Sequence, residues 1–274
     1  MSVLRRTFPT IGGELLFGKL FLPRGKAAGV AVLCHGLGGD HRTMEGPARD
    51  LVRRGIGALV FDLRGHGRSS GVFLGQAHLD VLAACGFLQG FPKAPLALVG
   101  HSLGAMACLQ VAAQLPGLAA LVLISMPSME GPRPKDFSGL AQQDVPREYP
   151  REGPPPWLRP LRGQWSRLWM WLRGYRLRIS WKACLENWSR VGLAEALQEL
   201  KACPKLFVHF AGDAVAPYQG ARQLYSQAPP PKDIILVRGG FHSAPLYPGP
   251  VRRRWVSWLA SVLQGGASPG NRSG

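Results

Sequence analysis

One serine of the chain has the surroundings that nucleophilic catalysis requires. Ser102 is the centre of the sequence Gly-His-Ser-Leu-Gly at residues 100–104, directly after the apolar run 96–99 and before a helix-forming stretch to about residue 115. A strand that turns tightly into a helix presents a serine Oγ at the turn. Glycines two positions away on each side allow the close backbone contacts of such a turn. The pattern predicts a nucleophilic serine and therefore a hydrolase.

A serine hydroxyl needs a base, because it is a poor nucleophile at neutral pH. Two histidines follow Ser102 in the sequence. His209 lies inside the apolar run 205–210, where we expect it to pack against a neighbour. His242 lies in a glycine-rich loop just after a second strand-like run. We therefore predict that His242 is the base.

A carboxylate should orient that histidine. Asp213 follows the run 205–210, at the strand end where open α/β sheets place their sites. The alternative for Asp213 is a helix N-cap ahead of Pro217. Asp233 precedes its predicted strand and would lie at the opposite edge of the sheet. The sequence thus favours Asp213 as the acid.

The oxyanion of an acyl-transfer intermediate needs fixed N–H donors. The amide of Leu103 follows the nucleophile at a predicted helix N-terminus, where backbone amides are free to bind an anion. The second donor is expected in the sequence His-Gly-Leu-Gly-Gly at residues 35–39, at the amide of Leu37. An ordinary turn is the alternative interpretation of this segment.

Apolar runs and helical patterns alternate along most of the chain. We expect strands at 15–22, 30–34, 58–62, 96–99, 121–124, 205–210 and 234–237, and helices at about 42–54, 77–86, 103–115, 218–226 and 251–263. Such alternation indicates an α/β fold, a mostly parallel central sheet with helices on both faces. The nearly continuous apolar character of the runs is typical of strands buried on both sides.

The alternation of strands and helices stops after residue 126 and resumes with the strand predicted at 205–210. Residues 127–164 are rich in proline, and residues 157–188 are rich in tryptophan and arginine with a helical apolar stripe. We expect a core of residues 1–126 and 201–264, an inserted helical cap at 127–200 and a flexible tail at 265–274. Trp165 and Trp169 are candidates for an apolar acyl pocket or for peripheral contact with an anionic membrane. The alternative is a lid that packs its apolar face on the core.

Together these motifs give the chain a family resemblance. It resembles the α/β-hydrolases of the broad esterase, monoacylglycerol lipase and serine aminopeptidase-like group, over residues 15–125 and 203–263. The matching segments, in order, are 35–39, 61–69, 100–104, Asp213-x-Val215-x-Pro217 and Gly240-x-His242. The resemblance implies that Ser102 is the nucleophile, His242 the base and Asp213 the orienting acid. It also implies that residues 62–69 form a structural loop near the pocket, and that His66 and His101 are hydrogen-bonded structural histidines.

The expected activity is hydrolysis of small-molecule carboxylic esters with apolar acyl or aryl groups, monoacylglycerol-like esters among them, through an acyl-enzyme and without a cofactor. The same three residues would also serve a thioesterase, an amidase or a peptidase, because one fold hosts many activities. A binding protein that retains the fold without catalysis is the alternative from another class.

The composition indicates which partners and which cellular compartment to expect. The net charge of +17 favours anionic partners, but no nucleic-acid motif accompanies it, so we expect no specific nucleic-acid binding. The five cysteines are scattered and form no Cys-x-x-Cys pair. This predicts buried free thiols, no metal site and a reducing, cytoplasmic location. The sequence has no apolar stretch of the roughly 20 residues that a membrane span needs, and its first residues do not resemble a secretory signal.

Overall fold

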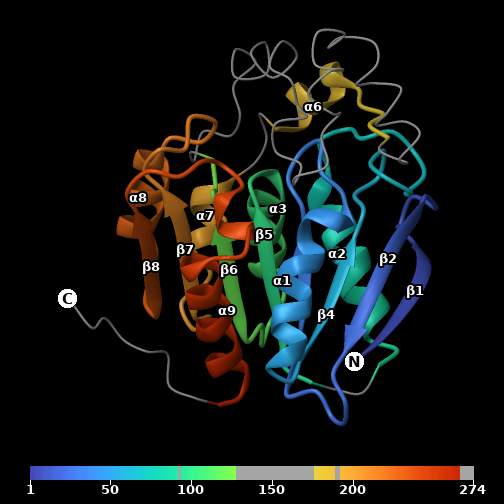
Figure 1. The fold of residues 1–274 in the computed structure, drawn as a ribbon. Helices are drawn as coiled ribbons and strands as arrows, with labels where there is room; N and C mark the ends of the chain where they lie inside the picture. The colour runs from blue at the N-terminus through green and yellow to red at the C-terminus, as the bar shows by residue number, and fades with distance from the viewer. Residues whose placement is uncertain (92–93, 128–175, 189–191, 266–274) are drawn as a thin grey trace, which may run out of the picture.

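The computed structural model of the chain describes residues 1–91, 94–127, 176–188 and 192–265 (Figure 1). The strands are β1 Ser2–Pro9, β2 Leu15–Leu22, β3 Gly29–Cys34, β4 Ile56–Phe61, β5 Leu96–His101, β6 Ala120–Ile124, β7 Lys205–Phe210 and β8 Lys232–Val237. The helices are α1 His41–Arg53, α2 Ala77–Leu88, α3 Leu103–Ala112, α6 Trp181–Trp188, α7 Leu193–Gln198, α8 Tyr218–Gln227 and α9 Pro250–Leu263, with a short 3-10 helix at Ala244–Leu246.

The eight strands in the described part of the chain form one sheet in the order β1-β2-β4-β3-β5-β6-β7-β8. The pairs β1–β2 and β2–β4 are antiparallel, and every pair from β4 to β8 is parallel. The chain passes from β3 to β4 on one side and then to β5 on the other, so the strand order reverses at β3. Ligands of open α/β sheets bind outside the carboxyl ends of the strands at such a reversal. This topology places the ends of β3 and β5 at the expected site.

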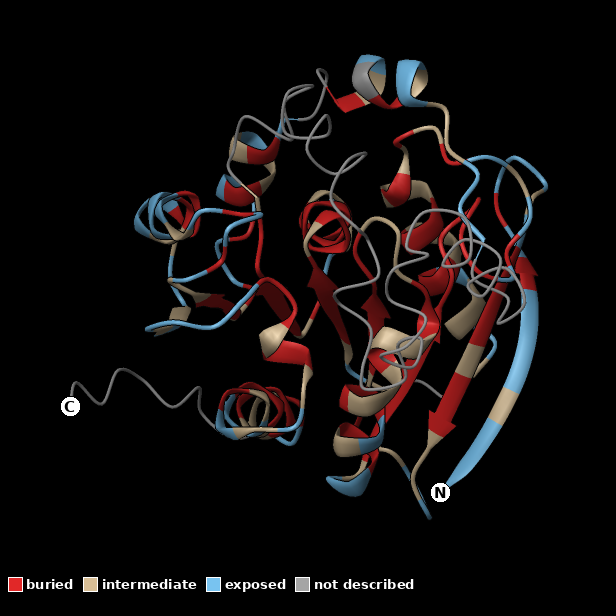
Figure 2. Ribbon diagram, turned by 45° about the horizontal axis from the view of Figure 1, so that its top comes forward, coloured by how far each residue is buried: buried red, intermediate tan, exposed pale blue. Residues whose placement is uncertain are grey.

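Helices cover both faces of the sheet (Figure 1). On one face α1 contacts β4 and α9, and α9 contacts β6. On the other face α2 packs against α3, α3 against α7, and α7 against α8. Figure 2 shows that the central strands are buried, whereas β1 at the edge is largely exposed. No helix in the described ranges combines the length and apolar character that crossing a bilayer requires.

Alternate residues of the strands pack into two apolar cores, one on each face of the sheet. In β3, Val32 belongs to the core beneath α2 and α3, whereas its neighbours Ala31 and Leu33 belong to the core beneath α1 and α9. Period-two alternation of buried side chains on both faces is what a fully covered sheet requires. Burial of this apolar area is the main favourable term in folding.

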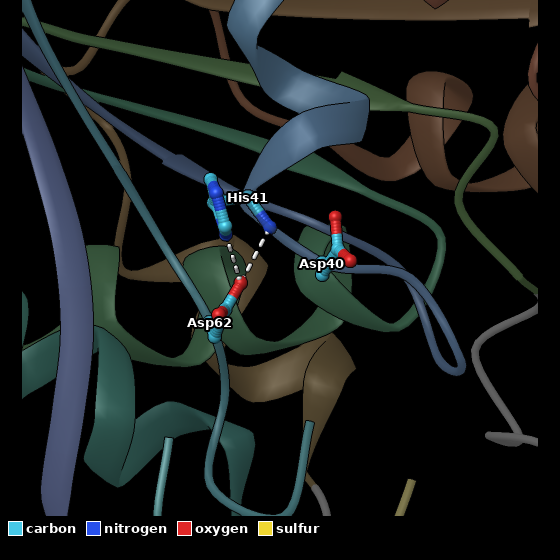
Figure 3. A group of neighbouring side chains, drawn as sticks. All are labelled: Asp40, His41 and Asp62. Atoms are coloured by element: carbon cyan, nitrogen blue, oxygen red, sulfur yellow. Dashed lines mark hydrogen bonds and ion pairs between the residues drawn. The ribbon is translucent and has the colours of Figure 1, made fainter. Parts of the chain in front are cut away.

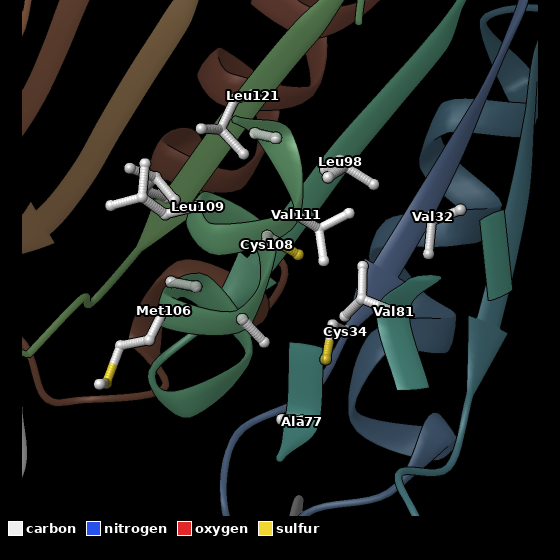
Figure 4. Close-up of a cluster of buried hydrophobic side chains, with 14 of the residues drawn as sticks. Val32, Cys34, Ala77, Val81, Leu98, Met106, Cys108, Leu109, Val111 and Leu121 are labelled. Atoms are coloured by element: carbon white, nitrogen blue, oxygen red, sulfur yellow. The ribbon is translucent and has the colours of Figure 1, made fainter. Parts of the chain in front are cut away.

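The cysteines contribute to these cores. Cys34 of β3 and Cys108 of α3 face the same cluster as Val32, Val81 and Leu98 (Figure 4). Burial raises the pKa of the Cys108 thiol well above its ordinary value, so this thiol stays protonated and behaves as a small apolar side chain. The five cysteines are free and buried, as the sequence predicted: Cys34, Cys85, Cys108, Cys184 and Cys203.

The strands and helices predicted outside the cap are all present, with differences at their ends. The strand predicted at 58–62 begins two residues earlier, at Ile56, because Gly57 pairs with Val30 in the ladder. The helix predicted at 103–115 ends at Ala112. The strand β1 was not predicted. Its side chains are exposed except Phe8 and, in part, Leu4, so it carries no continuous apolar run.

Part of the range expected as a cap lies outside the described residues, including Trp165 and Trp169. The described end of that range lies against the loop that follows β4. Leu177 forms a bridge with His66, and Ile179 forms one with Phe73. Residues 193–198 form α7, whose Leu193 and Leu197 pack in the core beside α3. The chain after residue 175 thus returns to the sheet along the loop at 62–74.

Candidate active site

Ser102 lies at the turn between β5 and α3, as the sequence predicted. Its φ of 54° is the left-handed conformation that a side chain disfavours, and its amide donates to the carbonyl of Ile124 at 2.9 Å. The flanking glycines are required by close packing. A Cβ on Gly100 would collide with the backbone of Gly104 and Ala105, and a Cβ on Gly104 would collide with the carbonyl of Cys34. The surrounding backbone therefore holds Ser102 in its strained conformation.

Asp213 and His242 meet at the carboxyl ends of β7 and β8. Nδ1 of His242 donates to Oδ2 of Asp213 at 2.8 Å, and both residues are buried. The other carboxylate oxygen, Oδ1, accepts the amides of Val215 and Ala216 at 2.9 Å each. Burial alone would raise the pKa of Asp213, but the hydrogen bond and charge of His242 outweigh it, so the pKa lies below its ordinary value. With Nδ1 protonated, Nε2 is the basic nitrogen of His242.

His242 lies beside the serine turn. The rings of His101 and His242 are 4.8 Å apart between centroids, and Nε2 of His101 donates to the carbonyl of His242 at 3.2 Å. His101 directly precedes Ser102 in the chain. The loop that carries the base is also tied to the loop that carries the acid, because the amide of Gly212 donates to the carbonyl of Gly239 at 2.8 Å. Three segments far apart in the sequence thus converge at one edge of the sheet.

The loop after β3 packs directly against the serine turn. A Cβ added to Gly36 would lie 3.1 Å from Cβ of Ser102. The amide of Gly39 donates to the carbonyl of Gly36 at 3.0 Å, and the amide of Gly38 donates to Nε2 of His66 at 3.2 Å. No described residue accepts a hydrogen bond from the intervening amide of Leu37. Leu103 begins α3 immediately after Ser102, so its amide belongs to a helix N-terminus.

His66 holds this loop in one orientation. Its Nδ1 donates to the carbonyl of Arg64 at 3.0 Å, which leaves Nε2 to accept from Gly38. Burial, together with the neighbouring His35, lowers the pKa of His66 to about 3. The ring is therefore neutral at any ordinary pH and keeps this tautomer. His66 and His101 are both buried and hydrogen-bonded, as the resemblance implied.

The two rejected candidates have other partners. His209 was expected to pack inside its strand. It is buried there, and its Nε2 donates to the carbonyl of Ala216 at 2.7 Å while lying 3.4 Å from Oδ2 of Asp213. It therefore lies against the acid, which the sequence did not predict. Asp233 is the second residue of β8 and does not precede it. Its carboxylate accepts the indole N–H of Trp258 at 2.7 Å, at the amino end of β8 and away from the carboxyl ends of the strands.

Asp40, His41 and Asp62 bring ligand atoms within 4.8 Å of one another (Figure 3). The chain's own donors already occupy these carboxylates. Asp62 accepts the amide and Nδ1 of His41 at 2.6 and 2.7 Å, and its other oxygen accepts the amide of Arg68 at 2.8 Å. Asp40 caps α1 through the amide of Arg42 and also pairs with that side chain. The donor set suits a structural lock between α1 and the loop at 62–69 better than a metal.

Comparisons with known proteins agree with this architecture. Residues 25–155 match the family described as serine aminopeptidase, S33. Human monoglyceride lipase is 35% identical over 122 residues, which cover 41% of this chain and 40% of the lipase. The chain therefore matches well under half the length of that relative.

Solved structures with the same fold include several esterases. The esterase domain of a Rhodothermus marinus protein is 24% identical with a TM-score of 0.65, covering 97% of each chain. A Pyrococcus furiosus esterase is 15% identical with a TM-score of 0.69, covering 96% of this chain and 91% of its own. Est1E from Butyrivibrio proteoclasticus, solved with ferulic acid, is 17% identical with a TM-score of 0.67, covering 95% and 96%.

The sheet order, the strand-turn-helix at Ser102 and the structural matches define the fold. The chain has the α/β-hydrolase fold. Among proteins with this fold it is similar to the group that contains esterases and monoglyceride lipase.

Proposed function

We propose that the protein is a serine hydrolase that cleaves carboxylic esters through an acyl-enzyme. Ser102 is the nucleophile, His242 the base and Asp213 the orienting acid. The observation that carries the proposal is the 2.8 Å hydrogen bond from His242 to Asp213, beside the strained turn of Ser102. A carboxylate that fixes one histidine nitrogen leaves the other free to accept a serine proton.

The reaction follows from these roles. Nε2 of His242 accepts the proton of Ser102, and Oγ attacks the ester carbonyl. The amides of Leu37 and Leu103 stabilise the oxyanion, which is usually the largest single contribution to such catalysis. His242 then protonates the leaving alcohol, which gives the acyl-enzyme, and next activates a water molecule that releases the acid and restores Ser102.

The proposed substrate is an ester with an apolar acyl or aryl group. The similarity to human monoglyceride lipase supports this class. Two exposed apolar side chains also adjoin the site: Val215 follows the acid by two residues, and Phe241 precedes the base. Phe241 is half exposed and packs edge-on against Tyr247, with centroids 5.6 Å apart. Contact of an apolar substrate with Trp165, Trp169 or the rest of a cap at 127–200 belongs to the same proposal, as does peripheral contact of that cap with anionic lipid.

Cleavage of an amide or a peptide is the second candidate, because the matching family is described as a serine aminopeptidase. The proposed residues would serve either bond. Initial rates on a matched ester, thioester and amide with the same acyl group separate these activities. We expect the ester to be cleaved fastest; a faster amide would reassign the enzyme to peptidases.

Hydrolysis of p-nitrophenyl butyrate by wild type and Ser102→Ala tests the proposal. The substitution removes only the hydroxyl oxygen of a partly exposed residue, so it leaves the fold intact. We expect wild-type turnover to fall to the uncatalysed rate at an unchanged melting temperature. Activity retained by Ser102→Ala contradicts the assignment. A wild type that neither turns over esters nor reacts with a fluorophosphonate would instead favour a non-catalytic binding protein.

A further inference from the structure

Two described residues other than glycine have a positive φ, Ser102 at 54° and Ser125 at 48°. This conformation is unfavourable for a residue with a side chain and persists where surrounding contacts impose it. The turn of the nucleophile accounts for Ser102. Ser125 follows β6, the strand next to β5, and the proposed reaction assigns it no role.

The contacts of Ser125 lead to the candidate base. Its amide donates to the carbonyl of Val208 at 2.9 Å, which extends the pairing of β6 with β7 by one residue. Its side chain is fully buried, and Oγ donates to the carbonyl of His242 at 2.7 Å. This short hydrogen bond joins positions 117 residues apart in the sequence. The strained backbone thus aims a buried hydroxyl at the main chain of His242.

The same carbonyl has a second donor, Nε2 of His101 at 3.2 Å. Burial and the nearby His242 lower the pKa of His101 to about 3, so its ring is neutral and carries one N–H. Because the acceptor is a carbonyl, that proton is on Nε2. The main chain of His242 is therefore held from the ends of two neighbouring strands.

Such an anchor adds to the hydrogen bond from Gly212 to Gly239, because the loop before His242 contains two consecutive glycines. Gly239 and Gly240 have φ values of 69° and 76°, and glycine adopts many other conformations at equal ease. Asp213 fixes the rotation of the imidazole, but it does not fix the backbone from which the imidazole projects. Two hydrogen bonds to the carbonyl of His242 supply that second restraint.

We propose that Ser125 is a positioning residue that fixes the backbone of His242, and thereby places its imidazole between Asp213 and Ser102. The inference rests on the proposed function, since it assigns Ser125 a role through the base. His101 contributes the second, longer hydrogen bond. A displacement of the base by about 1 Å can lower a rate up to 100-fold, so loss of one of the two donors should lower kcat.

Ser125→Gly separates this role from a structural one. Glycine removes the hydroxyl and relieves the strain at φ 48°. We expect the melting temperature to stay constant or rise while kcat for p-nitrophenyl butyrate falls about 10-fold at an unchanged KM. Reaction with a fluorophosphonate should slow by the same factor. A residue that only stabilises the fold would not produce this combination.

Two further variants complete the experiment. Ser125→Thr keeps the hydroxyl but places a β-branched residue in a strained conformation, so it should lower the melting temperature and restore most of the kcat that Ser125→Gly loses. Ser226→Gly is the control, because the hydroxyl of Ser226 donates to the carbonyl of Gln223 within α8, away from His242 in the sequence. It should lower stability and leave kcat unchanged.

The outcomes are distinct. A Ser125→Gly enzyme with wild-type kcat and labelling rate overturns the role of Ser125 and leaves the proposed function standing. An inactive, unlabelled wild type overturns the proposed function and this role together. If Ser125→Thr does not fold, the comparison of Ser125→Gly with Ser226→Gly decides the question by itself.

Discussion

Nε2 of His66 accepts a hydrogen bond from the amide of Gly38, at a distance of 3.2 Å. This contact joins the loop at 62–69 to the loop at 35–39, next to the amide of Leu37. It gives the loop after β4 a function beyond connecting two elements. A buried neutral histidine holds in place the backbone that we propose as half of the oxyanion site.

His66→Leu should therefore lower kcat/KM for p-nitrophenyl esters by about 10-fold, less than the 100- to 1,000-fold typical when an oxyanion donor is lost outright. The leucine fills the space but removes the hydrogen bond between the His66 ring and the amide of Gly38, so the loop can shift. Steady-state kinetics with a melting curve make the measurement. His78→Leu is the control, since His78 on α2 is only partly buried. Equal kinetics for both variants would rule out the positioning effect of His66.

Asp213→Asn should lower kcat by a factor on the order of 1,000 to 10,000 with KM nearly unchanged, because the amide favours the wrong tautomer of His242. Asp233→Asn is the matched control: Asp233 lies on the neighbouring strand and accepts Trp258 at the far edge of the sheet. We expect Asp233→Asn to affect stability and not kcat. A fall in kcat for Asp233→Asn alone would contradict the choice of acid.

The glycines of the serine turn should not tolerate a side chain. Gly100→Ala places a Cβ inside the backbone of Gly104 and Ala105, so it should destabilise the fold and abolish activity. Gly86→Ala offers the opposite case, because its Cβ on the interior of α2 meets no atom within 4 Å. It should raise the free energy of unfolding by about 0.5–1 kcal/mol. Denaturant melts of both variants test the contrast.

Stability should fall as the pH drops below about 6.5, the ordinary pKa of histidine. Burial lowers the pKa of both His66 and His101 to about 3, and it also lowers those of His35 and His209. Below 6.5 the unfolded chain binds protons that the folded chain does not, so the stabilisation is complete above 6.5 and is lost progressively toward the folded values.

Melting temperatures between pH 7.5 and 4.5 measure this effect. His66→Gln removes one of these groups, so its melting temperature should depend less on pH over that window. Burial also lowers the pKa of His78, but His78 is only partly buried, so His78→Gln should change the slope less than His66→Gln. A wild-type melting temperature that stays constant from pH 7 to 5 would show that these histidines are not held neutral.

Local patterns in the sequence predicted the sheet, and they also gave the candidates for the site. Continuous apolar runs marked β3, β4 and β5, since both faces of these strands are covered. The surroundings of Ser102, Asp213 and His242 each combined a strand end with turn residues. By contrast, β1 lies at the sheet edge with exposed side chains, so no apolar run identified it.

Contacts across the fold left no such pattern. Ser125 is one serine in an ordinary apolar context, and its strain and its bond to His242 arise only when β6 and the loop after β8 come together. The position of His209 against Asp213 likewise depends on how the loop after β7 turns back over its strand. Sequence patterns predict which segments form elements, whereas these restraints depend on the packing of distant segments.

Covalent labelling identifies the nucleophile. The protein is incubated with a fluorophosphonate, digested and analysed by mass spectrometry, with Ser102→Ala treated in parallel. We expect one adduct per chain, on the peptide that contains Ser102, and none on Ser102→Ala. An adduct on another residue, or an unlabelled wild type that still hydrolyses esters, would contradict this assignment.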